Sequence, residues 1–266
     1  MKTTFVLLAI FSLHAPAQVG LGLAPMRLEI DLEPGATYSG ALDLTNQAGG
    51  TIRIRGEILD FQIDETTTPQ FRRQIPSESA NSCREWLIAN PMDTEVAATE
   101  HLVIRYTFRV PQSATPGSYN CAVGYTTLPA ADTLKQTGLK SAVRLVASFY
   151  VIVGKPTIEG EISGLQFEPV PGAKDGSWQT ILVLRNLGPY HFRPIGSVHL
   201  LSATGATLET IEVPAFPALP RREQRYVIPV NLPNPSEVRK IKASVDLGSH
   251  EIQEASVDVA PIAALR

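Results

Sequence analysis

Charged residues are scarce in this sequence, and neither sign dominates. Only 18% of the 266 residues are Asp, Glu, Lys or Arg, with 26 acidic side chains against 23 basic ones. A protein that binds nucleic acid through its phosphates presents a basic surface, so we expect no nucleic-acid partner. Apolar residues make up 44% of the chain, enough to bury real cores, so disorder is not expected either.

Long apolar runs are also scarce, and the one at the N-terminus is short. It follows Lys2, extends from Phe5 to Leu13 and is succeeded by Ala15-Pro16-Ala17. The alternative of a membrane anchor is disfavoured, because such a run cannot cross the ~30 Å of a bilayer core. Small residues at the −3 and −1 positions are typical of a signal-peptidase site. We predict a signal peptide over residues 1–17, no membrane span, and export to the periplasm or cell surface.

The chain has only two cysteines, Cys83 and Cys121. In an oxidising compartment an even number of cysteines favours a disulfide. This bridge would close a loop of about 40 residues and contribute at most ~4 kcal/mol in the chain-entropy model. Zinc binding or thiol catalysis needs a CxxC pair or a further ligand nearby, and the sequence has neither. We therefore expect a Cys83–Cys121 disulfide.

Sharp catalytic signatures are missing as well. The sequence contains no GxSxG, HExxH, GxGxxG or P-loop motif. The four histidines after residue 17 lie in different segments, none with a neighbour at metal-ligand spacing: His101, His191, His199 and His250. We expect neither an enzyme nor a bound cofactor or metal.

What the chain does contain is a succession of short extended runs separated by turn residues. The clearest is His101–Val110, where apolar and polar residues alternate as in a half-buried strand. Ile63–Ala80 is polar and predicts a loop or a frayed strand pair. The other expected strands are Arg27–Leu32, Tyr38–Leu44, Thr51–Phe61, Ser118–Thr126, Ile158–Leu165, Thr180–Arg185, Gly196–Leu201, Leu208–Val213, Arg225–Val230, Arg239–Asp246 and Glu251–Val259. Many short strands without intervening helices indicate an all-β sandwich in each half.

One extended run, Ser141–Pro156, is longer and more apolar than the rest. Its odd positions from Val143 to Val153 form a continuous apolar face. Its even positions form a mixed face of Ala142, Arg144, Val146, Ser148, Tyr150 and Ile152. A helix is the competing interpretation, but the run has no helical polar stripe and is rich in β-branched and aromatic residues. We predict a strand that closes the first domain, with the boundary near residue 155.

Several short motifs occur in order along the first half of the chain: Ala24-Pro25-Met26-Arg27, Asp43-Leu44-Thr45-Asn46, Val110-Pro111, Pro116-Gly117-Ser118-Tyr119, Phe149-Tyr150 and Lys155-Pro156. Together they resemble the periplasmic chaperones of bacterial pilus assembly. In the second half, Leu184–Gly188 followed by His191–Gly196 is similar to a turn of tandem immunoglobulin-like exported proteins. The resemblance implies two tandem immunoglobulin-like β-sandwich domains, which would span residues 18–155 and 156–266.

The same resemblance implies a set of partner-binding residues. In the pilus chaperones an arginine on the first strand and a lysine on the last strand of domain one anchor the carboxylate of the bound subunit. Arg27 matches the arginine, whereas the lysine position falls on Val151 or Ala147. The face of the last strand that inserts large apolar side chains into the subunit corresponds here to Ala142, Arg144, Val146 and Ser148. These small, charged and medium-sized side chains would fill a hydrophobic groove poorly.

Two functions follow from these observations. The first is an exported protein-binding module that pairs a sheet edge with exported, pilin-like subunits. The alternative is a structural or scaffolding tandem immunoglobulin-like protein of the cell envelope, without chaperone activity, in which the long strand stiffens the hinge. The first function requires that Ser141–Val153 be an exposed or semi-exposed edge strand, and this is what we predict.

Overall fold

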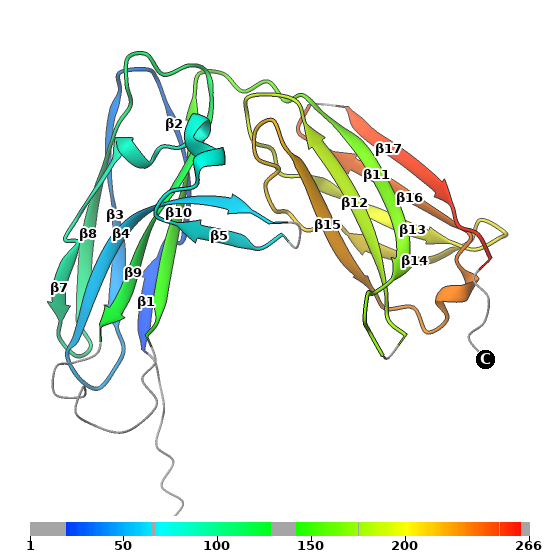
Figure 1. Cartoon of the computed structure of the whole chain (residues 1–266), viewed down its shortest axis with the longest axis horizontal. Helices are drawn as coiled ribbons and strands as arrows, with labels where there is room; N and C mark the ends of the chain where they lie inside the picture. The colour runs from blue at the N-terminus through cyan, green and yellow to red at the C-terminus, as the bar shows by residue number, and fades with distance from the viewer. Residues whose placement is uncertain (1–19, 65–66, 129–141, 175, 250, 262–266) are drawn as a thin grey trace, which may run out of the picture.

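The computed structural model describes residues 20–64, 67–128, 142–174, 176–249 and 251–261. They form two tandem immunoglobulin-like β-sandwiches, joined at one end and set at an angle to each other (Figure 1). The predicted all-β fold class is therefore confirmed. No helix in the described part of the chain is long and apolar enough to cross a membrane. The predicted signal peptide lies outside the described residues, and the boundary at residue 155 stays a prediction.

The first sandwich packs a sheet of strand order β1-β3-β8-β6 against a sheet of order β2-β10-β9-β4-β5, with β7 also paired to β4. Its strands are β1 (Leu21–Ala24), β2 (Arg27–Leu32), β3 (Thr37–Asn46), β4 (Ile52–Ile63), β5 (Pro69–Arg72), β6 (Leu87–Asn90), β7 (Asp93–Val96), β8 (His101–Arg109), β9 (Gly117–Leu128) and β10 (Arg144–Val153). Two short 3-10 helices, η1 (Pro76–Asn81) and η2 (Arg84–Trp86), lie between β5 and β6.

The second sandwich packs a sheet of order β11-β12-β15 against one of order β14-β13-β16-β17. Its elements are β11 (Gly160–Pro169), β12 (Trp178–Asn186), β13 (Ile195–Leu201), β14 (Thr207–Glu212), β15 (Glu223–Val230), the 3-10 helix η4 (Pro235–Glu237), β16 (Lys240–Asp246) and β17 (Ile252–Asp258). Each strand expected from the sequence has a counterpart here or in the first sandwich. The polar stretch that begins at Ile63 contains β5, paired to the end of β4, and then η1.

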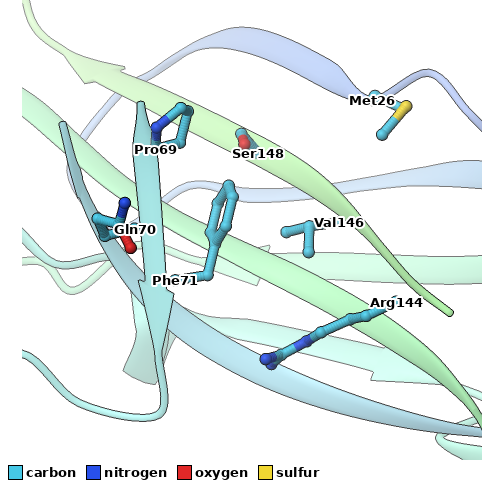
Figure 2. Close-up of a pocket in the computed structure, with 7 residues that line it drawn as sticks. All are labelled: Met26, Pro69, Gln70, Phe71, Arg144, Val146 and Ser148. Atoms are coloured by element: carbon cyan, nitrogen blue, oxygen red, sulfur yellow. The ribbon is translucent and has the colours of Figure 1, made fainter. Parts of the chain in front are cut away.

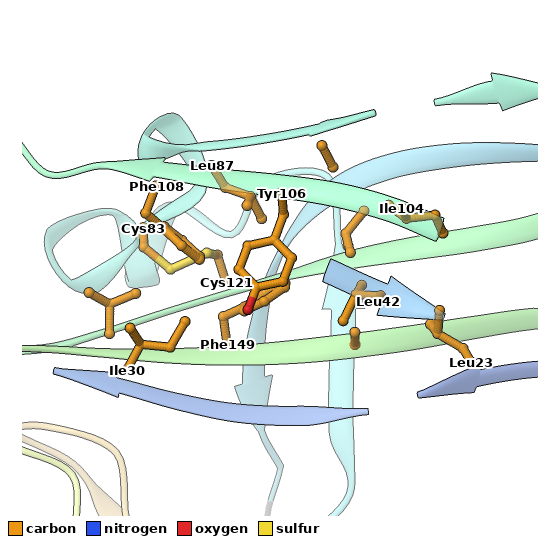
Figure 3. Close-up of a cluster of buried hydrophobic side chains, with 14 of the residues drawn as sticks. Leu23, Ile30, Leu42, Cys83, Leu87, Ile104, Tyr106, Phe108, Cys121 and Phe149 are labelled. Carbon is orange, nitrogen blue, oxygen red and sulfur yellow. A yellow bond between two sulfur atoms is a disulfide. The ribbon is translucent and has the colours of Figure 1, made fainter. Parts of the chain in front are cut away.

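The core of the first sandwich consists of the side chains that alternate inward from both sheets. Phe149 of β10 contacts Tyr106 and Phe108 of β8, with ring centroids 4.9 and 5.2 Å apart (Figure 3). Cys83 and Cys121 are fully buried beside these rings and form the predicted disulfide, with a Cα–Cα distance of 5.2 Å. The bridge ties the segment before η2 to β9.

The N-terminal segment changes sheets between its first two strands. β1 pairs antiparallel with β3 in one sheet, and β2 then pairs parallel with β10 in the other. Pro25, between them, has no amide hydrogen to offer to either sheet. Because β2 joins the sheet only after this crossover, it reaches β10 part of the way along, and that determines which part of β10 is covered.

Candidate partner-binding site

The two edges of β10 differ in how much of the strand they pair. On one edge β9 accompanies the whole strand, from Arg144 opposite Thr126 to Val153 opposite Gly117. On the other edge β2 pairs only from Ser148, opposite Arg27, onward. Within the described part of the chain, residues 144–147 therefore pair with a strand on one side only, although β1 contacts β10 without pairing with it. We call this segment the free edge of β10.

The free edge presents main-chain groups to whatever lies beside it. Ser148 N donates a hydrogen bond of 2.9 Å to Met26 O, so the even-numbered residues of β10 direct their main-chain groups towards β2. Main-chain groups of an antiparallel strand alternate between its two edges. Arg144 and Val146 therefore point their N–H and C=O groups past the end of β2. Unpaired groups of this kind form a template for a further strand.

The predicted edge strand is thus only partly correct. Residues 148–153 lie between β9 and β2 and are interior to the sheet, contrary to the prediction that Ser141–Val153 is an edge throughout. The reason is the parallel entry of β2, which local sequence patterns do not reveal. Ser141 lies outside the described residues. Ala142 is described and exposed, but it precedes the strand.

The two faces of β10 agree with the predicted alternation. Ala147, Phe149, Val151 and Val153 are fully buried in the core of the first sandwich. Arg144, Val146 and Ser148 point to the opposite face of the sheet, where Arg144 is exposed and the other two are half-buried. Both alternatives for the family lysine, Val151 and Ala147, belong to the buried face. Neither position can present a cation to a bound partner.

A hollow of about 550 Å³ lies on the outer face of β10 (Figure 2). Its lining residues come from β5, β10 and the crossover before β2: Met26, Pro69, Gln70, Phe71, Arg144, Val146 and Ser148. The hollow lies between β10 and β5, the strand that pairs with the end of β4. No local pattern in the sequence indicates this feature, because it depends on where β5 lies in the fold.

The side chain of Arg144 crosses β9 to reach β4. Its Nη2 lies 3.2 Å from Glu57 Oε2, and a Cβ at Gly124 would lie only 2.9 Å from Arg144 Nε. Glycine at 124 thus allows the guanidinium to pass over the strand. Arg73 Nε donates to the other oxygen of the same carboxylate at 2.9 Å. Two guanidinium groups share one carboxylate, which leaves an excess positive charge beside the hollow.

Arg27 lies at the other end of the site. It pairs in register with Ser148, so its side chain shares the face of the hollow, and the adjacent Met26 lines the hollow itself. Arg27 is exposed and has no ion-pair partner among the described residues. It is therefore an exposed cation on this face, and its role as a carboxylate anchor stays a prediction.

A second cation near this face comes from the other sandwich. Arg193 donates from Nε to Glu29 Oε1 at 2.8 Å, and its guanidinium carbon lies 4.9 Å from the ring centroid of Tyr150. Its Nη2 is buried and has no hydrogen-bond partner among the described residues. In the sequence, Arg193 stands out only as part of the turn motif His191–Gly196. A contact between domains leaves no local signal in the sequence.

The outer face continues into an apolar contact between the two sandwiches. Phe61, Tyr150 and Leu219 are buried together, with Phe71 and Val146 packed against this cluster. Phe61 and Tyr150 meet edge to face at 5.4 Å, and Phe61 and Phe71 lie 5.5 Å apart. Because Leu219 belongs to the second sandwich, the cluster fixes one end of the site to that domain.

Among the described residues, no three metal-ligating side chains gather in one place.

No protein-family model matches the sequence, and no curated protein matches it. Solved structures do resemble it. The class 5 fimbriae chaperone CfaA is 11% identical, with 91% of this chain and 100% of that chain covered and a TM-score of 0.47. The structure of the Salmonella enterica SafA pilin in complex with the SafB chaperone matches at 11% identity, with 91% of this chain and 99% of that chain covered and a TM-score of 0.48. The E. coli chaperone DraB is 10% identical, with 91% of this chain and 98% of that chain covered and a TM-score of 0.44. At these identities the likeness concerns the fold alone.

Proposed function

We propose that this chain is a periplasmic, non-enzymatic protein-binding module that pairs the free edge of β10 with exported subunits, in the manner of a pilus-assembly chaperone. The observation that carries the proposal is the half-covered β10. Its first four residues lack a paired strand on one side in the described chain, two of them, Arg144 and Val146, line the hollow, and the exposed cation Arg27 pairs with the next outward residue, Ser148. Main-chain pairing would supply affinity, and the side chains of the outer face would supply selectivity.

Two features favour binding over a purely structural role for this edge. Exposed strand edges are normally blunted by charge, proline or bulges, because they invite aggregation. The free edge carries one charge, on Arg144, and that charge is turned across β9 towards Glu57. The unpaired Arg27 adds a cation that the fold does not use, as a carboxylate anchor would require.

One observation favours the structural alternative. The far end of β10 is tied to the second sandwich, because Tyr190 donates from its hydroxyl to Val153 O at 2.9 Å. Ser118 N also donates to Pro189 O at 2.8 Å, and His191 N to Ser118 Oγ at 3.1 Å. In this second function the strand stiffens the hinge and binds nothing. A capture experiment separates the two functions.

The test compares capture of exported proteins from the native periplasm by the mature chain and by Val146→Asp. If the free edge binds subunits, the wild type retains a defined set of proteins and the variant loses them while staying folded by circular dichroism. Val103→Asp is the matched control, because Val103 is exposed on the other sheet. Equal capture by all three proteins would leave only the structural function.

A further inference from the structure

We infer that the hollow beside β10 receives a side chain from the bound partner, whereas the sequence resemblance implies a strand that inserts its own side chains into the partner. The occupant is an extended segment of an exported protein with a large apolar side chain and, two residues away on the same face, an aspartate or glutamate. The inference rests on the proposed function and specifies what the site selects.

The shape of the β10 face carries the first part of the inference. Val146 and Ser148 are half-buried, and an open hollow of about 550 Å³ lies between them and β5. A face that fills a partner's groove needs large side chains that stand proud of the sheet. Here the outer residues of β10 at this place are the small Ser148 and the medium-sized Val146, and both line a hollow.

The walls of the hollow suit an apolar guest. Phe71 of β5 lines it beside Val146 (Figure 2). The ring of Phe71 packs against Phe61, with 5.5 Å between ring centroids. Val146 forms the floor beside the free edge, and Met26, which is exposed, closes the opposite side. Methionine adapts its shape to the side chain that it meets. A strand that pairs with Arg144–Ala147 would place one of its side chains directly between these residues.

The charges around the hollow set the second requirement. Arg144 is a lining residue, and no acidic side chain lines the hollow. The carboxylate of Glu57 is shared with Arg73, so the three groups together carry one positive charge. Arg144 and Val146 are successive residues on one face of the strand. A partner strand paired with β10 would therefore place one apolar side chain beside Val146 and one acidic side chain beside Arg144. These two partner residues are two positions apart in the partner's sequence.

The probe is a set of short threonine-rich peptides with blocked termini. Each peptide carries one Phe and one Asp two positions apart, in either order. They are titrated into the isotope-labelled mature protein and followed by NMR. We expect saturable shifts at residues 144–148, and binding about tenfold weaker when Asp is replaced by Asn, as for the loss of one charge-assisted contact. Replacing Phe by Ala should also weaken binding about tenfold, because apolar burial in the hollow is lost. The Asp preference should vanish in Arg144→Gln but persist in Arg109→Gln, an exposed arginine of the other sheet.

Ser148→Leu distinguishes insertion of a partner side chain into the hollow from insertion of β10 side chains into the partner, because the two cases predict opposite effects on binding. The added side chain occupies the hollow, so we expect peptide binding to fall at least fivefold and capture of exported subunits to fall with it. If β10 instead fills a groove in the partner, the larger apolar residue should improve capture. Unchanged or tighter binding in Ser148→Leu, or an Asp preference that survives Arg144→Gln, would overturn the inference. In those cases capture that still depends on Val146 would leave the proposed function standing, whereas capture insensitive to Val146→Asp would remove both.

Discussion

Glu29 of β2 and Arg193 of the second sandwich form an ion pair across the domain junction, with 2.8 Å between Oε1 and Nε. Tyr150 of β10 packs against the same arginine and against His191, whose ring centroid lies 4.9 Å from its own. The second half of β10 is thus held between two domains, while its first half has a free edge. A strand fixed at one end can present that edge without paying the entropy of ordering it on binding.

The first prediction concerns acid stability at this junction. The neighbouring His191 ring and the Arg193 guanidinium, opposed by partial burial, lower the pKa of Glu29 from 4.5 to about 2. A carboxyl with a lowered pKa stabilises the fold above its unfolded pKa, and that stability is lost as the pH falls through the folded value. We expect the free energy of unfolding to drop between about pH 4.5 and 2 more steeply in the wild type than in Glu29→Gln.

Urea unfolding at a series of pH values measures this difference. The Glu29 side chain is 40% exposed, so solvent screening reduces the effect below what the pKa alone would give. Asp31→Asn is the matched control, because Asp31 is an exposed carboxylate of the same strand with no ion-pair partner in the described residues. Equal slopes for the wild type and Glu29→Gln would show that the ion pair does not stabilise the junction.

The second prediction separates the two faces of β10. Leu145 packs against the core of the first sandwich, whereas Val146 lies on the outer face. Leu145→Asp should destabilise the protein more than Val146→Asp does, because Leu145 is half-buried against the core and a charge placed there loses hydration without gaining a partner. Val146→Asp should remain folded and lose partner binding. Thermal unfolding and subunit capture measure the pair, and equal unfolding by both substitutions would mean that the outer face is as buried as the core.

The third prediction concerns the carboxylate anchor. Arg27→Ala should weaken binding of a partner that ends in a free carboxylate by about 1.5–3 kcal/mol, the range for hydrogen bonds to charged groups. The same partner with an amidated C-terminus should bind the wild type and the variant alike. Because no lysine of β10 faces Arg27, we expect a weaker anchor than an arginine–lysine pair would give. Isothermal titration measures these affinities, and full affinity in Arg27→Ala would exclude the residue from the site.

The fourth prediction concerns the disulfide. Cys83 and Cys121 are separated by 38 positions and are fully buried. The double variant Cys83→Ala, Cys121→Ala should lower the free energy of unfolding by about 2–4 kcal/mol, as expected for a bridge that constrains a loop of this length. Denatured, non-reduced wild-type protein should show no reactive thiol. Two titratable thiols in the exported protein would show that the bridge does not form in the cell.

The faces of the strands could be predicted from the sequence alone. Alternation over His101–Val110 predicted β8, and the odd and even positions of Ser141–Pro156 predicted which side of β10 is buried. The two cysteines of a chain with a signal-like N-terminus predicted their bridge. The faces are a local property, because side-chain direction in a strand repeats every two residues wherever the strand lies in the fold. The bridge follows from the number of cysteines.

The edges of the strands and the site between them were decided by tertiary structure. Whether β10 has a neighbour depends on where β2 arrives after Pro25, a contact between residues more than a hundred positions apart. The hollow needs the ring of Phe71 on β5, the side chain of Val146 on β10 and Met26 in one place. Arg193 reaches the site from another domain. Pairing and register are set by long-range packing, so no local pattern of residues specifies them.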